Sequence, residues 1–231
     1  MGASLVPKSR SATLPVSGKV VVRPAAATLS FPFPVLETTR LLLRPYAPAD
    51  TEAFYSLLHR SRERLRYSFP DRLRAVPTLA AAPAQLAAFA DDWRTGRFYV
   101  LGIWLRETGA YIGDICLMPQ RGGQAEIGYY LAAEAEGHGY AREALAAVCG
   151  FGFAPPVQAE RLLIRCFADN LRAQAVARAL GFLPQEPPTT ELPAWLRLSF
   201  WDSRPPQPAI LHFVRTATIE ELGVRNKALS W

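Results

Sequence analysis

The spacing of apolar residues along the chain predicts a group of hairpins, followed by a segment in which strands and helices alternate. Three apolar, β-prone runs occupy Phe98–Leu105, Tyr111–Met118 and Ala125–Leu131, separated by Arg106–Gly109 and by Pro119–Gly123. Apolar runs of this length between turn-forming residues are typical of strands joined by hairpins. We therefore expect these three strands to form an antiparallel meander.

The residues before the meander predict one strand and two helices. Arg40–Arg44 is a short apolar strand that Pro45 ends, and Pro48–Asp50 then begins a helix that reaches Leu58. A second helix is expected over Pro83–Trp93, because proline suits a first turn and apolar residues recur at helical spacing. Between the two helices we expect irregular chain. The predicted buried face of the second helix consists of Leu86, Phe89, Ala90 and Trp93, and Gly96 is its predicted end.

The segment after the meander predicts a strand–helix–strand–helix order. Gly181 stands where a left-handed residue would end the last of these helices. The expected elements are a loop at Gly137–Gly139, a helix over Ala141–Val148, a strand at Arg161–Phe167, a helix at Leu171–Leu180 and a last strand at Ala209–Val214.

Length and composition fit one folded domain over residues 36–231. The chain has 231 residues, 50% of them hydrophobic and 20% charged, which is enough to bury a core without a metal or a disulfide. Residues 1–35 contain five prolines and no acidic residue, so we expect a poorly ordered arm. An organelle transit peptide is the alternative, which the prolines disfavour. No apolar run approaches the roughly 18 residues of a membrane span, so none is expected.

The positive charge narrows the class of partner without identifying it. Lys and Arg number 26 against 20 Asp and Glu, a formal net charge of +6. A nucleic acid, a nucleotide cofactor and an acidic protein would each satisfy this excess. The densest basic stretch is Arg60–Arg74, where Glu63 and Asp71 interrupt six arginines. A solvated helix end and a surface for an anion or substrate are its two interpretations.

The cysteines and histidines show no metal-ligand spacing. The cysteines are odd in number and form no C-x-x-C pair, which argues against a disulfide framework and favours a reducing compartment. We therefore expect a cytoplasmic protein without a metal site. These residues are Cys116, Cys149, Cys166, His59, His138 and His212.

The most informative motif lies between the third meander strand and the next helix, at Glu136–Ala141. Glycines at 137 and 139 let the backbone approach a ligand closely, and the unpaired N–H groups that begin a helix attract an anion. This motif favours a phosphate-binding loop, although a plain strand-to-helix turn is the alternative. It lacks the Gly-Lys-Ser/Thr of a P-loop and the third glycine of the dinucleotide fingerprint.

Several motifs, taken in their order along the chain, resemble the GNAT superfamily of acyl-CoA-dependent N-acetyltransferases. They are most similar to the branch that acetylates the N-termini of ribosomal proteins, together with its small-molecule relatives. Over roughly residues 36–182 the resemblance implies an α/β (α+β) GNAT fold, a mixed, mostly antiparallel central sheet flanked by helices with a splayed cofactor-binding cleft. The motifs are Leu36–Arg44, Ala125–Leu131, Gly137–Ala144, Asp169–Asn170 and Ala179–Phe182.

The resemblance implies acetyl-CoA as co-substrate. In the family, N–H groups of the G-x-G-x-A loop hold the pyrophosphate and the pantetheine arm lies along the third meander strand. Asn170 faces that arm, and an N-cap is its other role. Neighbours on a strand point to opposite sides, so only one of Tyr129 and Tyr130 can face the cleft. The candidate cofactor-binding residues are Tyr129, Tyr130, Leu131, Gly137, His138, Gly139, Tyr140, Ala141, Arg142 and Asn170.

Two departures from the family concern its chemistry. Glu136 occupies a position where the family has Arg, Gln or an aromatic residue, and we expect its negative charge to weaken pyrophosphate binding. Ala173 replaces a serine proposed to protonate the leaving thiolate, which with a pKa near 8.5 leaves without obligatory protonation. The candidate general bases are Glu126, ranked first, and Glu191. An ion pair with an arginine is the alternative role of Glu126.

The sequence thus predicts an enzyme that transfers acetyl from acetyl-CoA to a primary amine by direct attack in a ternary complex. The acceptor is a protein N-terminus or a small-molecule amine. A GNAT-fold sensor that binds acyl-CoA without turnover is the alternative, because Glu136 and Ala173 depart from the family. A nucleic-acid-binding module is disfavoured, since acids interrupt the basic run. No membrane partner is expected, and a homodimer stays open.

Overall fold

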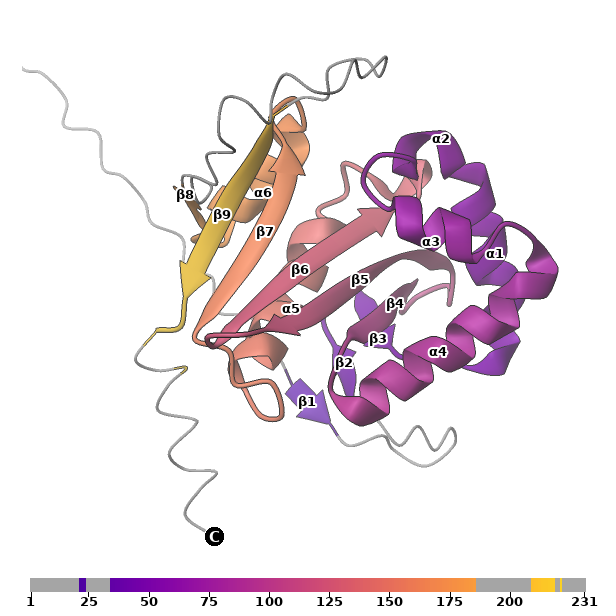
Figure 1. Cartoon of the computed structure of the whole chain (residues 1–231), viewed down its shortest axis with the longest axis horizontal. Helices are drawn as coiled ribbons and strands as arrows, with labels where there is room; N and C mark the ends of the chain where they lie inside the picture. Colours follow the sequence, from indigo (N-terminus) through magenta and orange to yellow (C-terminus); the bar gives the residue numbers. More distant parts are fainter. Residues whose placement is uncertain (1–20, 24–33, 186–208, 219–220, 222–231) are drawn as a thin grey trace, which may run out of the picture.

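The computed structural model describes residues 21–23, 34–185, 209–218 and 221, which fold around one mixed sheet (Figure 1). Its strand order is β1-β2-β3-β4-β5-β6-β7-β9-β8, and all neighbours are antiparallel except β6 and β7. This confirms the expected mixed, mostly antiparallel sheet. The strands are β1 (Val21–Arg23), β2 (Val35–Glu37), β3 (Leu41–Arg44), β4 (Tyr99–Leu105), β5 (Tyr111–Gln120), β6 (Gln124–Leu131), β7 (Arg161–Phe167), β8 (Leu183–Gln185) and β9 (Ile210–Thr216).

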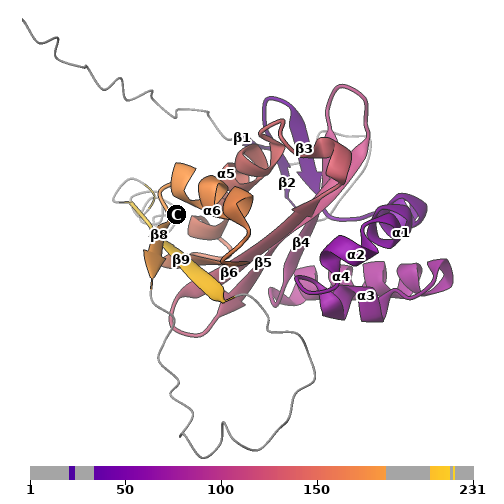
Figure 2. The same ribbon diagram turned by 90° about the horizontal axis from the view of Figure 1, so that it is seen from above.

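The helices divide between the two faces of this sheet. Helices α1 to α4 gather on one side, whereas α5 and α6 lie on the other (Figure 2). They are α1 (Thr51–Arg60), α2 (Arg62–Leu65), α3 (Pro70–Ala75), α4 (Ala82–Thr95), α5 (Tyr140–Phe153) and α6 (Leu171–Ala179), with 3-10 turns at η1 (Pro48–Asp50), η2 (Leu79–Ala81) and η3 (Ala133–Ala135).

The predicted meander is confirmed as β4, β5 and β6. Its first turn contains Gly109 in the left-handed region, with a φ of 69°, which glycine adopts without a steric penalty. The predicted strand–helix–strand–helix order is confirmed by β6, α5, β7 and α6. Gly96 and Gly181 are left-handed where α4 and α6 end, as the sequence predicts.

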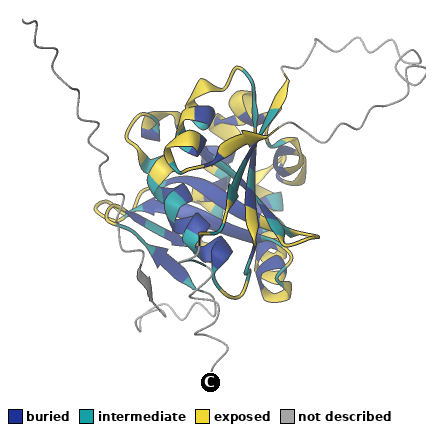
Figure 3. Ribbon diagram, turned by 90° about the vertical axis from the view of Figure 1, so that its left-hand side faces the viewer, coloured by how far each residue is buried: buried dark blue, intermediate teal, exposed yellow. Residues whose placement is uncertain are grey.

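The core lies on both faces of the meander. Most residues of helix α5 are buried, because it packs against strand β5 of the sheet and against α6. Figure 3 shows the buried ribbon in the middle of the molecule. On the opposite face, α1 and α4 contribute apolar side chains at helical spacing. The largest fully buried side chains include Phe54, Phe153, Phe182, Phe213, Leu41 and Leu101.

The helical region before β4 differs from the expectation at two points. The segment expected to be irregular contains α2 and α3, which are too short for an apolar period to show in sequence. On α4, Ala90 is exposed although it was placed on the buried face, and Asp92 is buried instead. Asp92 accepts a hydrogen bond from Arg97 Nε at 2.7 Å, which compensates the charge that burial would otherwise leave unpaired.

Strand residues occur before residue 36, where the domain is expected to begin. Val35 and Leu36 on β2 are buried, and β1 pairs with β2 in antiparallel register. Four residues of the expected arm, Val21–Arg23 and Val35, thus belong to strands, and its residues 1–20 and 24–33 lie outside the described residues. Within the described part of the chain, no helix combines the length and apolar character needed to span a membrane.

Candidate active site

The site begins where two neighbouring parallel strands separate. Pairing between β6 and β7 covers Gln124–Ile127 against Arg161–Ile164 and then stops. Beyond that point Gly128–Leu131 continues to pair with β5, and Arg165–Phe167 continues to pair with β9. The facing edges of the two strands therefore have no strand partner in the described residues, and their free N–H and C=O groups line a wedge-shaped opening. This is the splayed cleft that the family resemblance implies.

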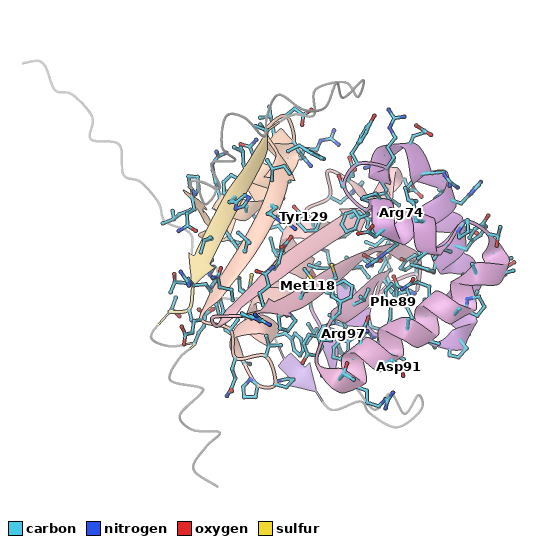
Figure 4. All side chains as sticks on the ribbon, viewed as in Figure 1. Arg74, Phe89, Asp91, Arg97, Met118 and Tyr129 are labelled. Atoms are coloured by element: carbon cyan, nitrogen blue, oxygen red, sulfur yellow. The ribbon has the colours of Figure 1, made fainter. Side chains whose placement is uncertain are left out.

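A cavity of about 740 Å³ occupies this opening and extends over the face that α3 and α4 cover. Its lining is mostly apolar and aromatic. Figure 4 labels Tyr129, Met118 and Phe89, which line it from β6, β5 and α4. The polar lining includes Glu126, Arg165 and Asn170.

The glycine loop leads from the sheet into helix α5. Gly137 and Gly139 both adopt the left-handed region, with φ of 80° and 77°, and Gly139 is the N-cap residue. A Cβ at position 137 would meet no atom within 4 Å, so this side of the loop is open. No side chain caps the first turn of α5, which leaves its N–H groups free for an anion.

A strap from the β2–β3 turn fixes the position of the loop. The Glu143 carboxylate, in the first turn of α5, accepts hydrogen bonds from Thr38 Oγ1 at 2.6 Å and from the backbone N–H of Arg40 at 2.8 Å. Arg40 also donates to the His138 carbonyl oxygen at 2.9 Å, and its guanidinium lies 4.7 Å from the centre of the Tyr140 ring. Partial burial raises the pKa of the Glu143 carboxylate, but these hydrogen bonds outweigh that effect and lower the pKa overall.

Among the loop residues assigned to the cofactor, Arg142 is exposed and has no ion pair within the described residues. His138 stacks on the Tyr140 ring with 5.5 Å between centroids. Loop residues 137–142 are not part of the cavity lining. The sequence predicted one site, and the structure distributes it over a cavity and a loop beyond the end of β6.

Glu136 has two cationic partners that the sequence does not indicate. Arg64 of α2 and Arg172 of α6 each form an ion pair with its carboxylate. The expectation that the charge of Glu136 weakens pyrophosphate binding stays a prediction, and two guanidinium groups lie beside that charge. Together these three residues carry one net positive charge.

The structure decides which tyrosine of β6 faces the cleft. Tyr129 lines the cavity, and its buried hydroxyl has no hydrogen-bond partner within the described residues. Burial raises the pKa of this hydroxyl, so it acts as a neutral donor. Tyr130 points to the opposite face of β6, which Gly128 and Glu126 share, and its ring meets the cavity-lining Phe69 edge-on at 5.2 Å. Tyr130 itself is not in the cavity lining. Leu131 is buried in the core.

Asn170 lies at the start of α6 beside the cavity, and its expected role toward the cofactor arm stays a prediction. Its Oδ1 accepts a hydrogen bond from the Ala173 N–H at 3.1 Å and so caps α6, and the residue also lines the cavity. Ala173 lines the cavity as well, where a serine would have offered a hydroxyl.

Glu126 lies in the cavity wall with its charge paired. The carboxylate accepts hydrogen bonds from Arg165 Nε at 2.7 Å and from Gln120 Nε2 at 3.0 Å, and its side chain is 15% exposed. The two roles that the sequence left open, candidate base and partner of an arginine, are thus compatible in geometry. Glu191, the second candidate base, lies outside the described residues.

Sequence reasoning missed a buried ion pair in the same cavity wall. Arg72 of α3 pairs with Asp114 of β5, and their side chains are 6% and 0% exposed. Nothing in the sequence separates Arg72 from the exposed arginines around it. Among the described residues, no group of three His, Cys, Asp or Glu side chains could hold a metal ion.

Comparison with known proteins gives this arrangement a family. The acetyltransferase (GNAT) domain matches residues 40–183, which cover β3 to the start of β8. The chain belongs to the GNAT acetyltransferase family. As a GNAT protein it is an acyl-CoA-dependent N-acetyltransferase with acetyl-CoA as co-substrate.

Individual relatives of this GNAT chain agree with the assignment. It is 29% identical over 152 residues to the uncharacterized N-acetyltransferase YoaA of Bacillus subtilis, covering 65% of this chain and 83% of the relative. The fold is shared with ribosomal-protein-S5-alanine acetyltransferase from Vibrio fischeri (TM-score 0.64, 18% identity, 79% and 96% coverage). It is also shared with Mycobacterium smegmatis RimJ, solved with CoA-disulfide (TM-score 0.60, 22% identity, 79% and 83% coverage).

The residues of this chain fit such a co-substrate. Its pyrophosphate would find the α5 N-terminus, which no side chain caps, and Arg142, which has no ion pair in the described part of the chain. Its amide-containing arm would find the separated edges of β6 and β7 and the Tyr129 hydroxyl, which has no partner there.

Proposed function

We propose that this chain acetylates a primary amine by direct attack in a ternary complex, with Glu126 receiving the proton of the attacking amine. The observation that carries this proposal is the separation of β6 and β7 after Ile127. It opens one cavity in which the arm-facing Tyr129 and Asn170 lie on one part of the wall and Glu126 on another. A thioester and an amine can therefore meet inside it.

Binding of acetyl-CoA rests on residues of β6, α5 and α6. The loop at Gly137–Arg142 holds the pyrophosphate through main-chain N–H groups, and Arg142 adds charge. Tyr129, Asn170 and the strand edges hold and orient the arm. Arg64 and Arg172 balance the charge of Glu136 beside the loop, which supports binding rather than repulsion of a phosphate.

The chemical step needs a neutral amine and a place for its proton. A peptide α-amine has a pKa of about 8 and is partly neutral at physiological pH, whereas a lysine amine near 10.4 is not. Nitrogen attacks the thioester carbonyl carbon, the C–S bond breaks and CoA leaves as the thiolate. Glu126 takes the proton that nitrogen loses, and Arg165 holds the carboxylate in place. With Ala173 in the wall, this position offers no hydroxyl to protonate the sulfur.

The acceptor class we favour is a protein N-terminus. Two observations support it: the lower pKa of an α-amine, which matches a carboxylate base, and the shared fold with two enzymes whose names refer to ribosomal-protein acetylation or to RimJ. A small-molecule amine is the other acceptor class. A direct assay with both kinds of acceptor distinguishes the two.

Thiol release tests the proposal. The full chain is mixed with acetyl-CoA and a panel of peptides, alkylamines and polyamines, and free CoA is titrated with a thiol reagent. Amine-dependent release with stoichiometric acetyl-amine supports the enzyme. Calorimetric binding of acetyl-CoA without release by any amine would show a sensor instead. Absence of acetyl-CoA binding would overturn the assignment of the site.

A further inference from the structure

Arg72 differs from every other arginine of the Arg60–Arg74 stretch because it is buried in the wall of the acetyltransferase cavity. Its side chain is 6% exposed, whereas that of its neighbour Arg74 is 77% exposed. The guanidinium lies 4.8 Å from the centre of the Phe89 ring, which lines the same cavity. Burial of a cation costs desolvation free energy, which its interactions in the folded protein or with a ligand have to offset.

The charge of Arg72 is balanced by one carboxylate. Nη1 donates to Asp114 Oδ2, and the Tyr46 hydroxyl donates to the same oxygen at 3.2 Å. Although burial raises the pKa of Asp114, the guanidinium opposes this shift. The pair is neutral as a whole, and the Asp114 side chain is completely buried whereas Arg72 lines the cavity.

The donors of Arg72 are not used up by this pair. A guanidinium has five N–H donors, and within the described residues Arg72 makes one hydrogen bond, to Asp114. No nitrogen of Arg72 is among the buried atoms without a partner in the described residues, so its remaining N–H groups are accessible from the cavity, where the oxygen of a ligand or of water can accept their hydrogen bonds. The cavity wall therefore presents donors without acceptors at this point.

Register places Arg72 and Glu126 over the same face of the sheet. Asp114 pairs with Tyr130, Cys116 with Gly128, and Met118 with Glu126, all on that face. The middle pair is the narrow floor of the cavity, since a Cβ on Gly128 would lie 3.4 Å from Cys116 Sγ. Four residues along a strand span about 13 Å, so a ligand reaching both ends is longer than a simple alkylamine.

We propose that Arg72 is a specificity-determining residue that donates hydrogen bonds to an uncharged carbonyl oxygen of the acceptor while its amine lies at Glu126. The inference rests on the proposed function and adds how the acceptor is selected. A peptide carbonyl satisfies the free donors without adding charge. A carboxylate would bring a second negative charge beside buried Asp114, which the neutral pair does not accommodate.

Acceptors that differ in one group test this. The three probes are tetra-alanine amide and tetra-alanine with its free carboxylate, which span about 13 Å when extended, and pentylamine compared per fraction of neutral amine. We expect kcat/KM for the tetrapeptide amide to exceed that for each of the others at least tenfold. Arg72→Met should lower kcat/KM for the amide at least tenfold, mainly by raising KM. The kcat/KM values of the three acceptors should then become similar.

Two further variants separate selection from a purely structural role. Asp114→Asn keeps the shape but removes the second negative charge, so it should lower the preference for amide over free carboxylate. Arg74→Met, on the same short helix but outside the cavity, should leave all three values unchanged. Arg72→Lys keeps a charge without the planar fork and should recover only part of the amide preference.

The outcomes remain distinguishable if a variant unfolds. Melting temperatures are measured for each, and if Arg72→Met does not fold, Asp114→Asn and Arg72→Lys decide. If the ratios of kcat/KM between the acceptors are unchanged in the folded variants, the proposal is overturned. If the wild type binds acetyl-CoA but acetylates none of a wide amine panel, it is the proposed function that fails.

Discussion

Charge compensation is the feature that individual residues of the site share. Glu126, Glu136 and Asp114 each lie beside at least one arginine, so the site holds carboxylates without isolated negative charge. Ion pairs of this kind orient the carboxylate as much as they neutralise it. For a base this matters, because the proton it accepts must arrive along a fixed direction.

Replacing the candidate base separates its two roles. Glu126→Gln keeps the shape of the side chain and removes its basicity. We expect kcat to fall roughly 100-fold at neutral pH with little change in CoA affinity, and to recover in part at higher pH as the free amine becomes neutral. Steady-state kinetics from pH 6 to 10 measure this.

Glu134→Gln is the matched control, since Glu134 forms an exposed pair with Arg60 away from the cavity. It should leave the rate unchanged. Full activity of Glu126→Gln with an unchanged pH profile would instead mean that Glu126 is a partner of Arg165 alone. In that case the variant should lose at most about 1 kcal/mol of stability, because Arg165 is largely exposed.

The glycine at the N-cap of α5 gives a second prediction at the scale of a residue. Gly139 has a φ of 77°, where a β-branched residue is strained by about 1–2 kcal/mol, and valine would also hinder close approach of a phosphate. We expect Gly139→Val to raise the Kd for CoA at least about tenfold, measured by calorimetry. Gly109→Val, strained alike in the remote β4–β5 turn, should lose stability but keep its CoA affinity.

At the scale of elements, the contact between the β2–β3 turn and α5 controls where the phosphate loop lies. Thr38 and Arg40 come from the turn, and Glu143 comes from the helix, so three hydrogen bonds join segments about 100 residues apart. The loop between the sheet and α5 is thereby held at both ends. The glycines allow the left-handed backbone conformation, and the hydrogen bonds of the strap stabilise it.

The strap makes stability depend on pH in a defined direction. The pKa of Glu143 is lowered in the folded state, so the carboxylate stabilises the fold above the unfolded pKa of about 4.3 and loses this contribution as pH falls through the folded pKa. We expect wild type to lose more stability than Glu143→Gln between pH 5 and 3, measured by urea unfolding. Equal slopes would show that the hydrogen bonds contribute nothing, and Glu134→Gln should match wild type.

For the whole molecule, we propose that a single catalytic domain begins at β2 and that the preceding residues are dispensable to activity. A chain starting at Pro34 keeps Val35 and Leu36, which are buried, and we expect it to retain its kcat/KM and to melt within a few degrees of the full chain. A chain starting at Thr38 removes both side chains and should lose about 4 kcal/mol or more. A large loss in the first truncation would mean instead that the arm stabilises the domain.

Local pattern explains why so much of the fold is predictable. Apolar period, together with glycine or proline at the boundaries, predicts the meander, helices α4 and α5, strand β7 and the left-handed ends at Gly96 and Gly181. These signals act between residues close in sequence. The glycine loop was found for the same reason, since its chemistry lies in six consecutive residues.

The tertiary structure alone decided the features that depend on residues far apart in sequence. Arg72 and Arg74 have the same sequence environment, and only the packing of α3 over β5 buries the one and exposes the other. Likewise the choice of Tyr129 over Tyr130 and the compensation of Glu136 depend on how strands and helices meet. The sequence by itself determined most of the elements and the family, because these follow from apolar period, from turn residues and from short motifs in their order along the chain. Which charges are paired, and which donors face the cavity, is a property of contacts through space that no local pattern records.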